Sequence, residues 1–118
     1  MTNDEMQTLI RNACKAAGWR IKKTGPVAGM VSVWIDDAPV IIRLADDDGD
    51  SRMLQVACKI ALAFAQTEDG KWCAEAYSHD DGKGDGCYSA CEACKDDANK
   101  AARMAVLRCA GMIGEAMQ

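Results

Sequence analysis

The spacing of apolar residues changes from helical to alternating along the chain, and this change limits the fold more than any other feature. Residues 2–17 place apolar side chains at helical spacing. Thr2 and Glu5 stand in capping-box positions, and Gly18 is suited to end the helix. Three short strand-like runs follow, at 19–24, 30–36 and 40–44. Short connections between them favour an antiparallel meander.

Helical spacing returns after an acidic loop at 45–50. We predict a second helix over 51–66, a fourth strand over 71–77 and a final helix over 96–117. In the final helix the residues expected to face inward are Ala98, Ala102, Ala105, Val106, Cys109 and Ile113. Gly111 and Gly114 each weaken that helix by up to about 1 kcal/mol relative to alanine. Glycine at these positions indicates either close packing against a neighbour or fraying of the helix end.

The predicted fold class is α+β, with the order α-β-β-β-α-β-α in a single domain, residues 1–118. An antiparallel sheet of about four strands would pack with the three helices. Aromatic residues make up 5% of the chain, so most of the core must come from Ala, Val, Ile, Leu, Met and Cys. Small side chains on helix faces let helices lie close to a sheet.

Charge and cysteine content limit the class of partner and the compartment. The net charge is −4, with 14 basic residues scattered among 18 acidic ones, which argues against a nucleic-acid partner. The first residues contain acids where a basic leader would be expected, and no apolar run is long enough to span a bilayer. We therefore expect a cytoplasmic protein with no membrane partner, whose seven cysteines stay reduced.

Residues 81–92, DGKGDGCYSACE, contain oxygen ligands at the spacing of a calcium loop. The residues at matching EF-hand positions are Asp81, Asp85, Gly86, Ser89 and Glu92. Lys83, however, stands at the third position, where it removes a carboxylate and places a cation beside the ion. Calcium is thus disfavoured.

The same segment contains thiols that zinc would prefer. Cys87, Cys91 and Cys94 lie close together, with Cys73 and His79 upstream. Only one Cys-x-x-Cys pair is present in this segment, so the spacing of a two-knuckle zinc site is missing. We expect no bound metal, and we keep calcium and zinc as alternatives.

A third interpretation is structural, and we favour it. Cys87, Cys91 and Cys94 follow the spacing of one helical stripe, and Ser89 could begin such a helix. Cysteine behaves as a small apolar residue and is often buried. Cys14, Cys58 and Cys109 lie in other predicted helices, as expected for core residues.

Catalysis has little support in the sequence. A catalytic thiol would have to pair with His79, the only histidine, with Asp80 or Asp81 as its orienting group. Phosphate-binding, dinucleotide-binding and serine-elbow motifs are all missing from the sequence. We therefore predict a protein that is not an enzyme.

Two stretches, WIDDAPVIIRLADDDGDSRMLQVACKIALAF and NKAARMAVLRCAGMIGEAM, resemble a family of small uncharacterised bacteriophage and prophage proteins with an α-β-α sandwich domain. The matching positions are Trp34, Asp47, Asp48, Gly49, Asp50, Ala101, Ala102, Arg103, Ala105, Val106, Arg108 and Ile113. Relative to that pattern, the strand at 40–44 and the segment 87–95 are additional. The resemblance implies a layered fold and an origin in a mobile element, with no active site to transfer.

The expected function is that of a small accessory protein that binds a host or phage protein without catalysis. The acidic loops at 45–50 and 80–86 are candidate binding surfaces, although solvated loops are their ordinary role. The alternative is a metal-binding module that uses the carboxylates or thiols of residues 73–94. A homo-oligomer is compatible with an open sheet edge.

Overall fold

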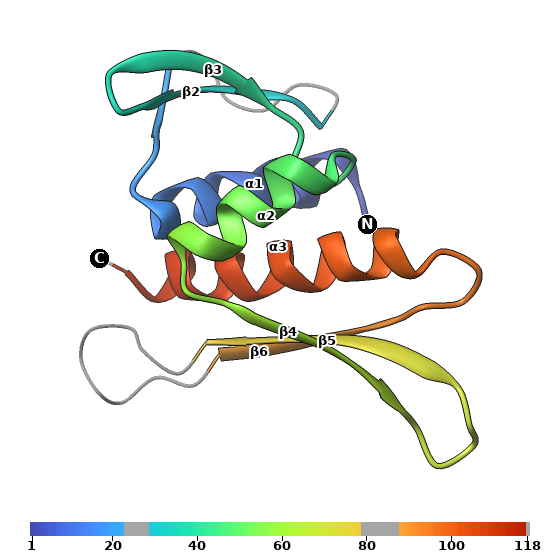
Figure 1. Ribbon diagram of the computed structural model, residues 1–118. Helices are drawn as coiled ribbons and strands as arrows, with labels where there is room; N and C mark the ends of the chain where they lie inside the picture. The colour runs from blue at the N-terminus through green and yellow to red at the C-terminus, as the bar shows by residue number, and fades with distance from the viewer. Residues whose placement is uncertain (23–28, 79–87, 118) are drawn as a thin grey trace.

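The computed structural model describes residues 1–22, 29–78 and 88–117, which form three helices and two three-stranded antiparallel sheets (Figure 1). The elements in order are α1 (Asn3–Ala17), β1 (Arg20–Ile21), β2 (Val31–Ile35), β3 (Ala38–Ile42), α2 (Asp48–Ala57), β4 (Ala61–Gln66), β5 (Trp72–Ser78), β6 (Tyr88–Ala93) and α3 (Ala98–Ala116). The predicted α+β class is confirmed, whereas the order and the number of strands differ from the prediction.

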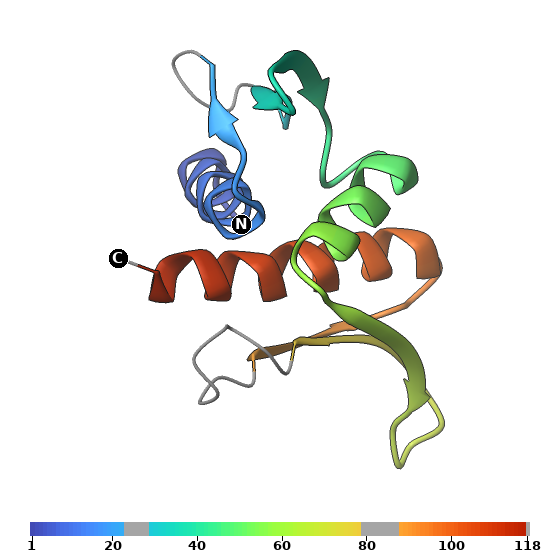
Figure 2. The same ribbon diagram turned by 60° about the vertical axis from the view of Figure 1, so that its left-hand side comes forward.

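Helix α3 lies at the centre of the layers. On one side it packs against α1 and α2, and on the other it covers the sheet β4-β5-β6 (Figures 1 and 2). The second sheet, β1-β2-β3, lies on the far side of α1 and α2 (Figure 1). The fully buried residues of the core include Ile10, Cys14, Val33, Ile42, Leu44, Leu54, Val106, Leu107 and Cys109. As composition predicted, this core consists mostly of aliphatic, alanine and cysteine side chains, and Trp19 is its aromatic member.

Helix α1 forms as its local signals predict. The Thr2 hydroxyl accepts a hydrogen bond from the Glu5 backbone N–H at 3.1 Å, and the Glu5 carboxylate accepts one from the Thr2 N–H at 3.2 Å. Gly18 ends the helix with a φ of 77°, which glycine adopts without steric cost. These are interactions between near neighbours, so the sequence alone is enough to predict them.

Close packing accounts for the two glycines of α3. A Cβ atom added at Gly114 would lie 1.7 Å from the backbone oxygen of Asn12, and one added at Gly111 would lie 2.3 Å from Cδ1 of Leu9. Both glycines are buried. The sequence left close packing and fraying open, and the structure shows that α1 and α3 cross in contact.

The predicted helix over 51–66 is wrong in its second half. Helix α2 ends at Ala57, Cys58 caps it, and Lys59 reverses the chain with a φ of 56°. Residues 61–66 then form β4, which pairs with β5 along its whole length. Phe64 fits the predicted helical face with Ile60 and Ala61, and it also shares a strand face with Leu62, so spacing did not separate the two structures. Pairing with β5 decides in favour of the strand.

The helix expected to begin at Ser89 is also a strand. Residues Tyr88–Ala93 form β6, which pairs with β5 in register from Cys73–Ala93 to Ser78–Tyr88. The described residues therefore contain two strands, β4 and β6, that the sequence analysis assigned to helices. Alanine-rich segments favour helices weakly, and a non-local backbone pairing overrides that preference.

Candidate metal centre

Strand pairing brings two cysteines and a glutamate onto one face of a sheet. Glu75 lies opposite Cys91, and Cys73, two residues earlier on β5, lies on the same face as Glu75. Their β5 neighbours Ala74 and Ala76 are fully buried beneath α3. The group Cys73, Glu75 and Cys91, here called the thiol cluster, therefore lies on the sheet face that points away from α3.

The atoms of the thiol cluster are close enough to share one ion. The two sulfurs and a carboxylate oxygen of Glu75 all lie within 4.8 Å of one another. Cys73 is only 6% exposed, whereas Glu75 and Cys91 are exposed. The cluster thus has one anchored ligand and one side open to solvent.

Its surroundings hold the Cys91 thiol in the protonated form well beyond neutral pH, because its pKa is raised. Hydrogen bonding with Cys73 is the main cause that raises the pKa of Cys91 to about 11, from an ordinary value of 9.0. Desolvation and electrostatic repulsion from the neighbouring cysteine, from Glu75 and from Glu92 raise it further. A cation at this position would reverse this effect by stabilising the thiolate, and would release the proton.

Cys91 and Cys94 do not form a zinc knuckle. Cys91 is exposed on the outer face, whereas Cys94, three residues later, is buried in the core beneath α3. An odd separation places two residues of an extended chain on opposite faces. The stripe predicted for these cysteines is therefore wrong for Cys91, while Cys94 is a core residue as expected.

Glu92 has a structural role on the inner face of the same sheet. Its carboxylate forms an ion pair with Arg108 of α3. It therefore lies on the face opposite Cys91, where it fixes β6 to α3. Asp81, Asp85, Cys87 and His79, the other residues considered for metal binding or catalysis, lie outside the described residues.

The remaining helix cysteines are core residues, as predicted. Cys14, Cys58 and Cys109 are buried. Burial raises the pKa of Cys14 and of Cys58 to about 12, and the neighbouring thiols add to the effect at Cys58. Cys73 is buried as well, but its sulfur lies in the thiol cluster.

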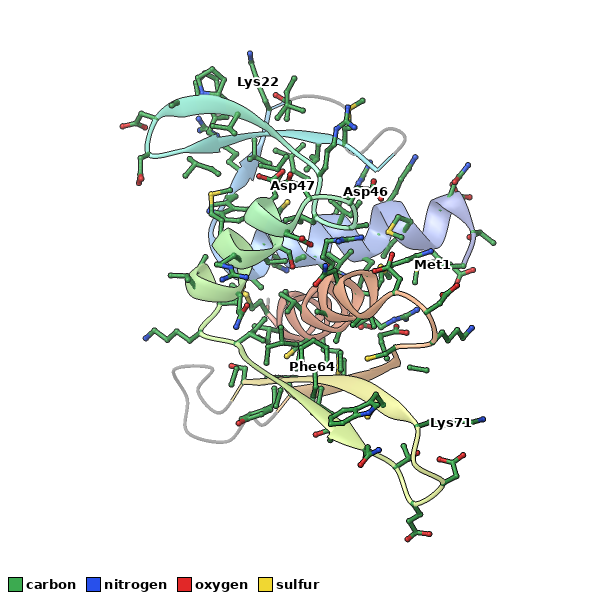
Figure 3. The ribbon with its side chains drawn as sticks, turned by 45° about the vertical axis from the view of Figure 1, so that its right-hand side comes forward. Met1, Lys22, Asp46, Asp47, Phe64 and Lys71 are labelled. Carbon is green, nitrogen blue, oxygen red and sulfur yellow. The ribbon has the colours of Figure 1, made fainter. Side chains whose placement is uncertain are left out.

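The acidic loop at 45–50 organises the start of α2 (Figure 3). Asp47 caps the helix by accepting a hydrogen bond from the Asp50 N–H at 2.8 Å. Asp50 in turn accepts one from the Arg43 N–H at 2.8 Å. Asp48 pairs with Arg103 of α3 at 2.6 Å. Three of its four aspartates thus have partners within the fold, which weakens this loop as a candidate binding surface.

Glu75 is the candidate ligand that sequence reasoning did not name. The signal was present as Cys-x-Glu, a spacing that places both side chains on one face of a strand. Its significance depends on β6 being a strand as well, since only the pairing of β5 with β6 brings Cys91 opposite Glu75.

Comparison with family models, curated proteins and solved structures found no match to this chain. The resemblance to phage proteins therefore stays a prediction. Within the described residues, each helix is too short or too polar to cross a membrane.

Proposed function

We propose that this protein is a metal-binding module that holds a zinc-class ion through the sulfurs of Cys73 and Cys91 and the carboxylate of Glu75. The observation that carries the proposal is the 4.8 Å limit on the distances among the three ligand atoms. Ligands at about 2.0–2.3 Å from a tetrahedral zinc ion lie roughly 3.5–3.8 Å apart. Binding of the ion would therefore require side-chain rotations that draw the three atoms together by up to about 1 Å.

The ligand set favours zinc over calcium. Calcium takes six to eight oxygen ligands, whereas two thiolates and a carboxylate suit a borderline-soft ion. Three protein ligands leave a fourth position on the exposed side of the sheet, where Glu75 and Cys91 face solvent. Water or a donor from a partner protein would complete the coordination.

Cobalt(II) titration of the untagged, chelator-free protein tests this proposal. We expect one equivalent to bind, with the sulfur-to-cobalt charge-transfer absorption that thiolate ligands produce. Cys91→Ser should weaken binding by at least about 100-fold, since even outer-shell changes cost up to that much. Glu75→Gln should weaken binding less, because both thiolates remain.

Cys94→Ala is the matched control, because it removes a nearby thiol that lies outside the cluster. It should bind cobalt as the wild type does. Equal losses in Cys94→Ala and Cys91→Ser would instead support the Cys-x-x-Cys pair. A wild-type protein that binds neither cobalt nor zinc would overturn the proposal.

A second candidate function is the binding of a host or phage protein without catalysis, in the host cytosol if the protein is phage-encoded. A groove of about 590 Å³ between α1, α3 and β6 supports it. Leu9 and Met112 contribute apolar surface. Asp4, Glu5 and Glu115 supply acidic groups, and the one basic residue of the lining, Arg108, is paired with Glu92. This combination suits a basic amphipathic helix.

Binding of a labelled basic amphipathic peptide, followed by fluorescence anisotropy, tests the second candidate. Met112→Asp should abolish binding, because it places a charge on the apolar surface of the groove. Val56→Asp is a control, since Val56 is exposed on α2 and does not line the groove. Equal affinity of both variants would rule out the groove.

A further inference from the structure

We propose that two copies of this chain join along β4, edge to edge, to form a continuous six-stranded antiparallel sheet. Strand β4 lies at one edge of the sheet β4-β5-β6, and within the described residues it pairs with no strand except β5. No described strand lies along its other edge, where backbone N–H and C=O groups form a template for a further strand.

Strand β4 lacks the features that protect other edges. Its sequence, ALAFAQ, contains neither a charged residue nor proline. By contrast, the edge strand β3 contains Pro39, β1 is only two residues long, and β6 contains Glu92. Charge, proline and short length are the usual means of preventing edge-to-edge association. Among the described edges, β4 is thus the one suited to pairing.

The sequence of β4 is complementary to itself in the antiparallel direction. Residues 61–65, ALAFA, read almost identically from either end. A two-fold axis at Ala63 would place Leu62 of one copy opposite Phe64 of the second copy. The alanines at 61 and 65 would likewise face each other, so large and small residues stay on separate faces of the joined sheet.

Phe64 supplies an apolar surface for this contact. It extends from β4 on the side of the sheet that faces α3, and it is 47% exposed (Figure 3). Trp72, opposite the end of β4, is 53% exposed, and both rings line one shallow apolar pocket. A second β4 strand beside the first would cover Phe64, because cross-strand neighbours on one face are in contact.

This inference does not depend on the proposed metal site. The thiol cluster lies on β5 and β6, whereas the free edge belongs to β4. The joined sheet would carry one cluster from each copy on the same outer face. Dimerisation and metal binding can therefore be tested separately, and either result leaves the other unchanged.

Sedimentation velocity over a range of concentrations, in reducing buffer with a chelator, tests the pairing. We expect a dimer for the wild type. Ala63→Lys should raise the dimer dissociation constant at least about tenfold, because the axis brings two lysines opposite each other. Ala93→Lys, a matched change on the exposed face of β6, should dimerise as the wild type does. Far-UV circular dichroism would verify that both variants fold.

A cross-link tests the register independently. Residues directly opposite each other in an antiparallel pair have Cα atoms about 4.5–5.5 Å apart, within the range for a disulfide. On mild oxidation, Ala63→Cys should therefore form a disulfide between the introduced thiols of the two copies, identified by peptide mass spectrometry. The thiols introduced by Ala61→Cys should form no such link to each other. A monomeric wild type at its highest soluble concentration would overturn the proposal. A dimer that Ala63→Lys does not weaken and that Ala63→Cys does not cross-link would also overturn it.

Discussion

Replacing Gly114 by alanine tests the helix crossing on which the layered fold depends. A Cβ atom there would lie 1.7 Å from the backbone oxygen of Asn12 and 2.5 Å from its carbonyl carbon. The first distance is about half of an ordinary contact of 3.4 Å. The obstructing atoms are backbone atoms of α1, so no side-chain rotation can relieve the overlap. The two helices must move apart.

The expected cost follows from two opposing effects. At an ordinary interior position of a helix, glycine to alanine stabilises by about 0.8–1 kcal/mol. Overpacking of a core costs about 1–3 kcal/mol and occasionally more. Separation of α1 from α3 also loosens the packing around buried Ile10 and Leu107. We expect a net loss of about 2 kcal/mol in the free energy of unfolding, or about 8 °C in Tm for a chain of this length.

Gly111→Ala is the matched control, one turn earlier on the same helix. Its Cβ would lie 2.3 Å from Cδ1 of Leu9, a half-buried side chain at the groove that can rotate away. We expect its stability to stay within about 1 kcal/mol of the wild type, because the gain in helix propensity offsets the rearrangement. Urea unfolding followed by circular dichroism measures both variants. If Gly114→Ala is as stable as Gly111→Ala, α1 and α3 do not cross at this distance.

Three further predictions follow from the charges and thiols. Hydrogen bonding in the thiol cluster raises the pKa of Cys91 to about 11, so metal binding releases a proton. The affinity measured by cobalt titration should therefore rise at least about tenfold per pH unit near neutrality. A pH-independent affinity would contradict this. Arg103→Ala should lower the free energy of unfolding in urea by about 2 kcal/mol, because Arg103 donates to the Ala45 carbonyl at 2.8 Å and pairs with Asp48 at the start of α2. Arg52→Ala is the control, and it should cost almost nothing because Arg52 is exposed. Burial raises the pKa of Cys14 and Cys58 from 9.0 to about 12. The unfolded chain therefore loses these protons before the folded protein does, so the stability that the two thiols contribute is complete below pH 9.0 and is lost towards pH 12. The loss is up to about 1.4 kcal/mol per pH unit for each thiol. A variant with alanine at both positions should lose less stability over that range, and an equal loss would contradict the assignment.

The helix boundaries show where sequence reasoning succeeds. Thr2, Glu5 and Gly18 define α1 through contacts with residues a few positions away. Asp47 likewise caps α2 through the N–H of Asp50. Interactions of this kind are encoded locally, and the pattern that predicts them is the cause of the structure.

The segments 61–66 and 88–93 show where sequence reasoning fails. Both are rich in alanine, which favours helices, and Phe64 fits the face of the predicted helix as well as the alternating face of a strand. Their state is decided by β5, which hydrogen-bonds with both strands. The candidate site also depends on this pairing. The sequence analysis named Cys73 and Cys91 as possible ligands, whereas Glu75 became a candidate only because the register of β5 and β6 places it opposite Cys91.

The sequence by itself determined the α+β class, the ends of the first helix and a core of aliphatic residues and cysteine. The helix ends depend on hydrogen bonds between residues a few positions apart, and the class and the core follow from the periodicity and composition of the chain. Tertiary structure alone decided which alanine-rich segments became strands, which cysteine faced outward and which carboxylate joined the thiols. Those outcomes depend on backbone pairing between distant segments, and the free energy of that pairing exceeds the small local preference for helix.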